Sequence, residues 1–229
     1  MKRFYEEVAV APSADGFGLL LDGRPVKTPG RVALAVPSAR LGEGIADEWR
    51  AQGETIDPRS MPLTGLANAA IDRIAPDPAT FAAGLARYGE NDLLCYRAEG
   101  PVELARQQAD AWDPYLAWAR SRYDVELKVT AGIVHVGQPE VTVERLGKAA
   151  ASRTPFELAG LSPLVTVSGS LVIALAVAEG AFTPDQAWHA ATVDERWQTE
   201  KWGSDDEAVA ALANRRRDFD AGALFLSLL

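Results

Sequence analysis

Few of the 229 side chains belong to the types that usually carry out catalysis, because the chain has two histidines and one cysteine. Histidine most often exchanges protons near neutral pH, and cysteine and histidine are the usual soft-metal ligands. His135 falls in a predicted strand and His189 on a predicted helix, and we interpret both as structural. The lone Cys95 excludes an internal disulfide and a cysteine-rich zinc site, and it fits a reducing compartment.

The sequence also lacks the short motifs that bind phosphates or metals. It contains no GxxxxGK(S/T) loop, no GxGxxG between a strand and a helix, no HExxH and no paired-cysteine motif. Ser168 and Ser170 flank a glycine inside a predicted helix, away from the sharp strand-to-helix turn that exposes a catalytic serine. We therefore expect no catalytic residue, no cofactor, no metal ion and no small-molecule substrate.

Two charged runs occur near the C-terminus. Asp205, Asp206 and Glu207 cannot converge on one metal ion by themselves, because successive residues of a helix point in different directions. We interpret them as acidic side chains that compensate the dipole at a helix N-terminus. The run Arg215 to Arg217, later on the same predicted helix, forms either a solvated, salt-bridged face or a recognition patch.

The six tryptophans suggest protein contacts, since tryptophan and tyrosine most often anchor such contacts. Trp197 and Trp202 lie on different parts of one predicted helix, which Gly203 ends. An aromatic side chain beside such a helix–helix corner, with charged neighbours, predicts a docking site; the alternative is that both tryptophans are core residues. By contrast, Trp49 shares an inward-facing helical stripe with Leu41 and Ile45, so we expect a structural role. The candidate client contacts are Glu200, Trp202, Asp205, Asp206 and Glu207.

The first part of the chain predicts short strands. Alternating or apolar runs cover residues 4–10, 17–21 and 32–36, and Asp-Gly pairs between them are typical of hairpin turns. Ser38 then caps a predicted helix. A second hairpin is predicted over residues 125–130 and 133–136. Between the two β regions, a helix over residues 103–123 is expected to kink or split at Pro114.

From about Glu140 onward the pattern is helical. Capping-box patterns start at Thr154, Thr183 and Ser204, and residues 164–177 are apolar nearly all round, which predicts one central helix. We expect an α+β fold: an N-terminal β-rich domain with flanking helices over residues 1–90, and a mainly α-helical domain over residues 91–229.

Charge and the first residues bear on partners and location. The 23 basic and 32 acidic side chains give a net charge of −9, which argues against binding to nucleic acid or anionic lipid. The start, Met1 to Glu7, has no apolar signal segment and carries acidic residues that transit peptides avoid. We therefore expect a soluble, cytoplasmic, bacterial protein. The longest apolar stretch, Leu161 to Ala178, is interrupted by serine, threonine and glycine, so we expect no membrane insertion.

Short segments in a fixed order along nearly the whole chain carry a family resemblance. They are Lys2–Tyr5, Leu21–Pro29, Pro37–Ser38, Glu48–Gln52, Met61–Thr64, Ala70–Asp72, Asp92–Arg97 and Glu195–Gly203. Each segment is weak alone, whereas the ordered set is specific. Together they resemble the F-type ATP synthase F1 assembly chaperone family, in the member that handles the alpha subunit of the catalytic head.

The resemblance implies a non-enzymatic chaperone with an N-terminal β-rich domain and a C-terminal helical domain. Such a protein binds the free alpha subunit and prevents its aggregation until the beta subunit takes over the same surface. A ring subunit exposes apolar interfaces before assembly, and a reversible cover lowers the concentration of the aggregating species.

A carboxylate acid/base enzyme stays the alternative, since two of the 32 acidic residues can meet in space. A deep pocket lined by carboxylates with perturbed pKa values would favour the enzyme. A broad, shallow face with exposed aromatic side chains would favour the chaperone.

Overall fold

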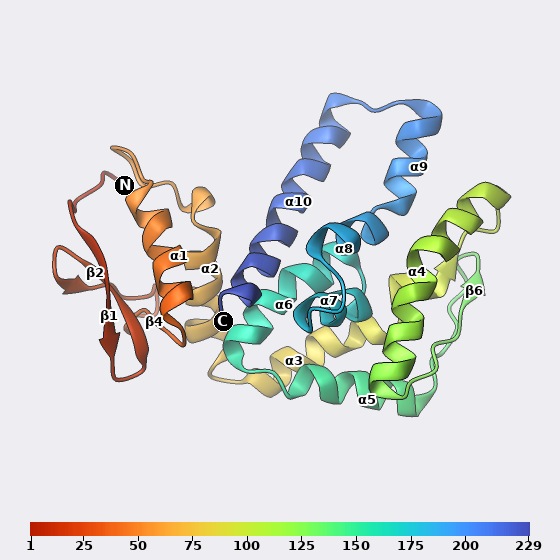
Figure 1. The fold of residues 1–229 in the computed structure, drawn as a ribbon, viewed down its shortest axis with the longest axis horizontal. Helices are drawn as coiled ribbons and strands as arrows, with labels where there is room; N and C mark the ends of the chain where they lie inside the picture. The colour runs from red at the N-terminus through yellow and green to blue at the C-terminus, as the bar shows by residue number, and fades with distance from the viewer. The chain divides into compact units, whose positions relative to one another are not determined.

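The computed structural model describes residues 1–229, and the chain divides into two compact units. The first unit comprises Met1–Pro78, Thr154–Gly160 and Leu224–Leu229, and the second comprises Ala79–Arg153 and Leu161–Ala223. A small sheet near the N-terminus precedes a largely helical chain (Figure 1), which confirms the expected α+β class. The division into domains 1–90 and 91–229 stays a prediction, because compactness does not measure independent folding.

The sheet of the first unit is built on one antiparallel hairpin. In it β1 (Val8–Ser13) pairs with β2 (Gly16–Leu21), and β2 also pairs with β3 (Arg24–Pro25) and β4 (Ala35–Val36). Gly16 has φ +123°, and a Cβ there would lie 2.3 Å from the carbonyl oxygen of Val36, so only glycine fits. The strands expected over 4–10 and 32–36 begin later than predicted, at Val8 and Ala35.

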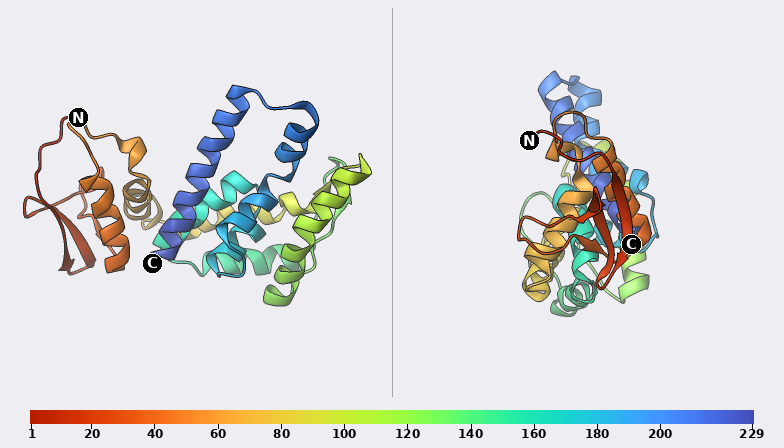
Figure 2. Two further views of the ribbon diagram at one scale, coloured as in Figure 1. Left: turned by 45° about the horizontal axis from the view of Figure 1, so that its top comes forward. Right: turned by 90° about the vertical axis from the view of Figure 1, so that its left-hand side faces the viewer.

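One helix covers this sheet, as the red hairpin beside the orange helix in Figure 2 shows. Ser38 begins α1 (Ala39–Arg50) by accepting a hydrogen bond from the Leu41 amide at 3.0 Å. Leu41 and Ile45 are buried, and the Trp49 ring lies 5.5 Å from that of Tyr5. The structural role expected for Trp49 is thus confirmed. The unit continues with η1 (Pro58–Ser60), α2 (Pro62–Ala69) and η2 (Ala70–Ile74).

The last residues of the chain complete the first unit. The Ser38 hydroxyl donates to the carbonyl of Leu228, so one side chain caps α1 and holds the C-terminus. Phe225 is fully buried, and its ring stacks on that of Phe156 with 6.4 Å between centroids. Residues from three separate stretches of sequence therefore share this core.

The second unit is helical and has α7 (Leu171–Ala178) at its centre. The residues from Leu171 to Ala176 are buried, and α4, α5 and α8 pack against this helix (Figure 1). The remaining helices of the chain are α3 (Pro78–Ala86), η3 (Arg87–Gly89), η4 (Leu93–Cys95), α4 (Val102–Tyr123), α5 (Glu140–Ala151), α6 (Pro155–Ser168), α8 (Pro184–Ala191), α9 (Val193–Trp202) and α10 (Asp206–Ser227). None of these helices has the length and apolar character needed to cross a membrane.

The prediction of a central apolar helix is confirmed by α7, but the expected extent over residues 164–177 is wrong, because two helices cover it. Gly169 takes a left-handed conformation with φ +70° and ends α6, and Ser170 begins α7 by accepting from the Ile173 amide at 3.0 Å. The Ser168 hydroxyl, 2.6 Å from the Leu164 carbonyl, bonds back into the helix that ends there. Side-chain hydrogen bonds and a glycine thus override the apolar pattern.

The prediction of a second hairpin over residues 125–136 is also wrong. Thr130–Ala131 forms β6, which pairs in parallel with β5 (Tyr96–Arg97), and His135 lies in the loop after β6 rather than in a strand. The apolar run over 125–136 was compatible with local pairing, but the partner strand lies more than thirty residues earlier in the sequence.

Helix caps and the internal proline give mixed outcomes. The capping boxes at Thr154 and Thr183 are confirmed, with both reciprocal hydrogen bonds present. The third box is wrong, because Asp205 instead of Ser204 accepts from the Ala208 amide, at 2.8 Å. Pro114 does not split its helix, since α4 runs unbroken from Val102 to Tyr123.

Candidate functional site

The corner between α9 and α10 is built by local backbone chemistry. Gly203, at φ +81°, ends α9, and its amide donates to the Thr199 carbonyl at 2.9 Å. Asp205 then caps α10 two residues later. Because a left-handed residue and a cap occur within three residues, the chain reverses there and α10 runs back antiparallel to α9 (Figure 1).

The two tryptophans of this region have opposite environments. Trp197 is 5% exposed, and the Lys201 ammonium lies 4.7 Å from its ring centroid. Trp202, at the end of α9, is 78% exposed. The alternative that both are core residues is therefore wrong for Trp202 and right for Trp197. An exposed tryptophan at a helix corner is an unpartnered apolar surface within an otherwise packed unit.

A cavity of about 920 Å³ opens between α9 and α10, with part of α8 as its base. Glu200, Trp202 and Asp205, three of the five predicted contacts, line it. Asp206 and Glu207 are exposed on the first turn of α10 and do not belong to the lining. The structure thus brings three of the candidates together and leaves two on the adjoining surface.

The apolar lining of this cavity was not among the residues predicted from the sequence. It comes from Trp188 on α8 and from Ala208, Val209 and Leu212 on α10. Val209 is 53% exposed although it is apolar. The spacing of residues 208, 209 and 212 could have predicted this apolar face from the sequence, because residues four apart lie on the same side of a helix.

The cations around the cavity are mostly engaged within the protein. Arg215 pairs with Glu195 at 2.6 Å, and Arg216 pairs with Asp185 at 2.5 Å and with Asp220 at 2.7 Å. The salt-bridged interpretation of the arginine run therefore holds for these two residues.

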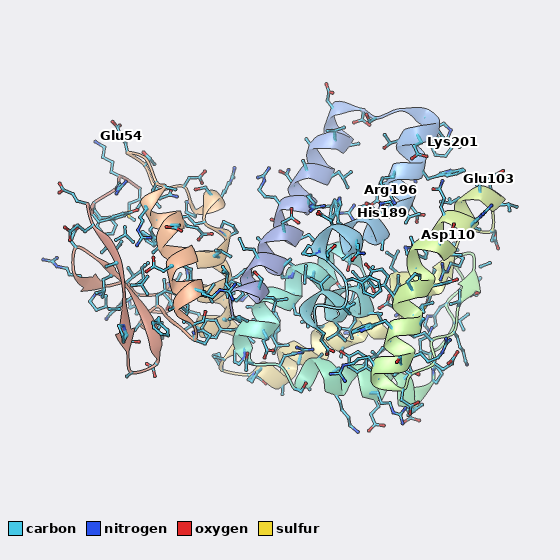
Figure 3. All side chains as sticks on the ribbon, in the orientation of Figure 1. Glu54, Glu103, Asp110, His189, Arg196 and Lys201 are labelled. Atoms are coloured by element: carbon cyan, nitrogen blue, oxygen red, sulfur yellow. The ribbon has the colours of Figure 1, made fainter.

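Arg196 is also held internally, since its guanidinium donates to the carbonyls of His189 and Thr192 (labelled Arg196 and His189 in Figure 3). Burial lowers the pKa of Arg196, and the nearby carboxylates of Glu200 and Glu195 oppose that shift.

The acidic side chains at the corner are less engaged than the cations. Glu200, Asp206 and Glu207 form no ion pair with a lysine or arginine side chain in this structure. The rim of the cavity therefore carries carboxylates without an ion pair beside an exposed aromatic ring, although the charge of Glu200 still acts on Arg196. That combination suits an apolar segment with basic neighbours better than it suits an acidic one.

Buried carboxylates elsewhere bear on the enzyme alternative. Asp92 is fully buried, and burial raises its pKa to about 6 against the hydrogen bonds that it accepts from Ser170 and from backbone amides. Its oxygens accept from the amides of Leu94 and Val172, each at 3.1 Å, so it caps the starts of η4 and α7. This carboxylate is used for helix capping.

Glu48 in the first unit has the same kind of role. Burial raises its pKa, and its oxygens accept from the amides of Leu63 and Thr64 and from the Thr64 hydroxyl at 2.6–2.8 Å. The two carboxyl groups with raised pKa values therefore belong to different units and hold different helices. No group of three or more histidine, cysteine or acidic side chains is close enough to share a metal ion.

Comparisons with known proteins agree on one family. A family model described as ATP12 chaperone protein matches residues 2–120. The protein named "Protein atp12, mitochondrial" of Schizosaccharomyces pombe is 26% identical over 219 residues, which covers 90% of this chain and 75% of that protein.

Solved structures extend the similarity over almost the whole chain. The crystal structure of Atp12 from Paracoccus denitrificans is 41% identical and superposes with a TM-score of 0.95, covering 99% of this chain and 97% of that one. The Atu1473 protein of Agrobacterium tumefaciens is 39% identical, with a TM-score of 0.93 and coverage of 99% and 85%.

Proposed function

This chain belongs to the ATP12 family of F1 ATP synthase assembly chaperones, and from that premise we propose that it binds the free alpha subunit of the F1 head. It covers the interface of that subunit and releases it to the beta subunit. The family resemblance read from the sequence is confirmed, whereas the identity of the client is our proposal. The observation that supports it best is the exposed Trp202 beside the apolar cavity between α9 and α10.

The proposed contact works through burial rather than catalysis. An unassembled ring subunit exposes apolar surface that associates with any similar surface, so its solubility falls with concentration. A partner that inserts one large aromatic side chain at the centre of a contact gains most of the binding free energy there. Trp202 offers such an anchor, and Glu200 and Asp205 form its charged rim.

We also propose that this role is non-enzymatic and is performed in the bacterial cytoplasm. The two structural relatives come from Paracoccus and Agrobacterium, and their identity to this chain is higher than that of the mitochondrial relative.

Co-expression with the alpha subunit tests the proposal. We expect the alpha subunit to stay in the soluble fraction and to co-purify with this chain. Trp202→Ala should reduce the co-purified amount about tenfold, the effect typical of a central aromatic anchor. Glu200→Lys should also weaken retention, because it places a cation on the rim where the client brings its own.

The matched control is Val32→Ala, which truncates another exposed apolar side chain, in the first unit. All three variants should melt as the wild-type protein does. If the alpha subunit is equally insoluble with and without this chain, the proposal is wrong. If Trp202→Ala and Glu200→Lys retain it fully, the corner is not the contact.

A further inference from the structure

The loop between β6 and α5 exposes two neighbouring apolar side chains. Ile133 is 98% exposed and Val134 is 73% exposed. Single exposed apolar residues are common on protein surfaces, but two successive ones projecting from a loop form a patch. The loop is held at its base, because the Gly132 amide donates to the Arg97 carbonyl at 2.9 Å directly after the pairing of β5 and β6. Its apolar side chains are thus presented from an anchored position.

An acidic hollow lies next to this patch. A cavity of about 420 Å³ is lined by His135 and by the carboxylates of Glu90, Glu140 and Glu144. Glu144 pairs with Lys148 at 2.6 Å, whereas Glu90 and Glu140 form no ion pair. The loop therefore exposes two apolar side chains, and an acidic hollow with two unpaired glutamates lies at its side.

The patch lies at the same end of the second unit as the proposed corner contact. Gln108 of α4 bonds Asp194 of α9 at 2.7 Å, and Trp112 bonds the Ala190 carbonyl at 2.8 Å. This antiparallel register brings the first turn of α4 to the last turn of α9, as the labels of Glu103 and Lys201 show in Figure 3.

One exposed apolar side chain lies at the start of α4, close to the end of α9. Val102, the first residue of α4, is 79% exposed, and it follows shortly after β5, to which the loop is tied. A client that contacts Trp202 can therefore extend across Val102 toward Ile133, past the exposed carboxylates of Glu99 and Glu103.

We propose that the Ile133–Val134 patch and the acidic hollow form a second contact for the same client, one that takes an apolar segment with a lysine or arginine nearby. The apolar side chains of the segment pack on the patch, and its cation enters between Glu90 and Glu140. This inference rests on the proposed function. A second copy of this chain fits less well, because its net charge of −9 would bring like charges together.

The second contact can be tested by how well this chain suppresses aggregation of the alpha subunit. Purified alpha subunit is diluted from urea into increasing amounts of this chain, and light scattering gives the concentration that halves aggregation. For Ile133→Ser/Val134→Ser we expect that concentration to rise about tenfold, since apolar anchors carry much of an interface. For Glu90→Gln/Glu140→Gln we expect a rise of roughly threefold and a weaker dependence on salt. Val32→Ser, an exposed site in the first unit, should match the wild type.

The outcomes separate this inference from the proposed function. If the wild-type chain does not suppress aggregation at all, the proposed function fails. If it does, and Trp202→Ala weakens it while both patch variants act as the wild type, the second contact is wrong and the corner stands. If light scattering during gel filtration shows that the wild-type chain forms a dimer, and the patch variants lose that dimer but still protect the client, the inference is also wrong. The glutamine variant keeps the test valid if the serine variant melts early.

Discussion

At the scale of single residues, environment decides what a tryptophan does in this chain. Trp49 packs on Tyr5 in the first unit, Trp197 is buried under the Lys201 ammonium, and Trp202 is exposed at the end of its helix. The same side chain is thus structural at two positions and available for a partner at the third. Substitutions at these positions should separate stability from binding.

Trp49→Arg should unfold the first unit or lower its stability by about 3 kcal/mol, because it removes a large packed ring and places a charge in an apolar cluster. That cluster contains Tyr5, Leu21, Ile56 and Met61. Trp202→Arg is the matched control and should stay within about 0.5 kcal/mol of the wild type, as exposed sites do. Urea titration measures both. A wild-type midpoint for Trp49→Arg would contradict the structural assignment.

Asp92 shows how a buried carboxylate couples folding to pH. The fold raises its pKa from 3.8 to about 6, chiefly by burial, so the folded state favours the protonated form. The stability that this group contributes is fully present below its unfolded pKa and is lost as the pH rises through about 6.

The loss of folding stability caused by Asp92→Asn should therefore depend on pH. The gap in unfolding free energy between the wild type and this variant should narrow by roughly 3 kcal/mol between pH 3 and pH 7. Glu126→Gln should behave in the opposite sense, because the hydrogen bond from Arg120 lowers the pKa of Glu126 and its stabilisation appears as the pH rises. Urea unfolding across this pH range gives both gaps. A gap for Asp92→Asn that does not change with pH would remove Asp92 as a titrating group.

At the scale of elements, single residues decide where helices end. The apolar run around Gly169 is compatible with one long helix, yet the left-handed glycine and the Ser170 cap divide it into α6 and α7. At the start of α7, the Val172 amide also donates a hydrogen bond to the Asp92 carboxylate. A buried helix end needs such partners, because its first amides have no acceptor within the helix.

Gly169→Ala should cost about 1–2 kcal/mol, since a left-handed conformation strains a residue with a Cβ. The new Cβ itself would meet only an ordinary contact, 3.9 Å from the Leu93 Cβ, so the cost is conformational. Gly147→Ala is the matched control inside α5, where a Cβ meets Ala86 at 3.8 Å, and it should stabilise by about 0.5–1 kcal/mol. Thermal unfolding compares the two. If Gly169→Ala and Gly147→Ala melt at the same temperature, Gly169 is not required for the break between α6 and α7.

At the scale of the whole molecule, the chain returns to its first unit twice. The stretches Thr154–Gly160 and Leu224–Leu229 both join residues 1–78 in one compact body. Gly160 is close to the side chains of Phe225 and Leu226, and a Cβ at this position would lie 2.7 Å from Leu226 Cγ, so only the smallest residue fits there. The first unit is therefore complete only when the last residues of the chain are in place.

Phe225→Ala should open the first unit even though the change lies near the C-terminus, because truncating a fully buried phenylalanine costs about 3–5 kcal/mol. Hydrogen exchange followed by mass spectrometry should show faster exchange within residues 1–78. Leu224→Ala, at a half-exposed neighbour, is the control and should leave that exchange unchanged. Protection of residues 1–78 in Phe225→Ala would mean that the first unit folds without its C-terminal residues.

The sequence by itself determined the family, the α+β class and most of the helices. These follow from local signals: the cap at Ser38, the stripe of Leu41 and Ile45, and the reciprocal boxes at Thr154 and Thr183. Each depends on residues within one or two helical turns, which short-range physics can evaluate. For the same reason, the sequence predicted the corner at Gly203 and the candidate contacts Glu200 and Trp202.

Only the tertiary structure decided which of these residues are exposed and which are buried. Trp197 and Trp202 have the same local signal, and their burial depends on which helices pack nearby. The pairing of β6 with β5 and the return of Phe225 to the first unit join residues far apart in sequence. Such contacts depend on burying apolar surface across the whole chain, a sum that no short window of sequence contains.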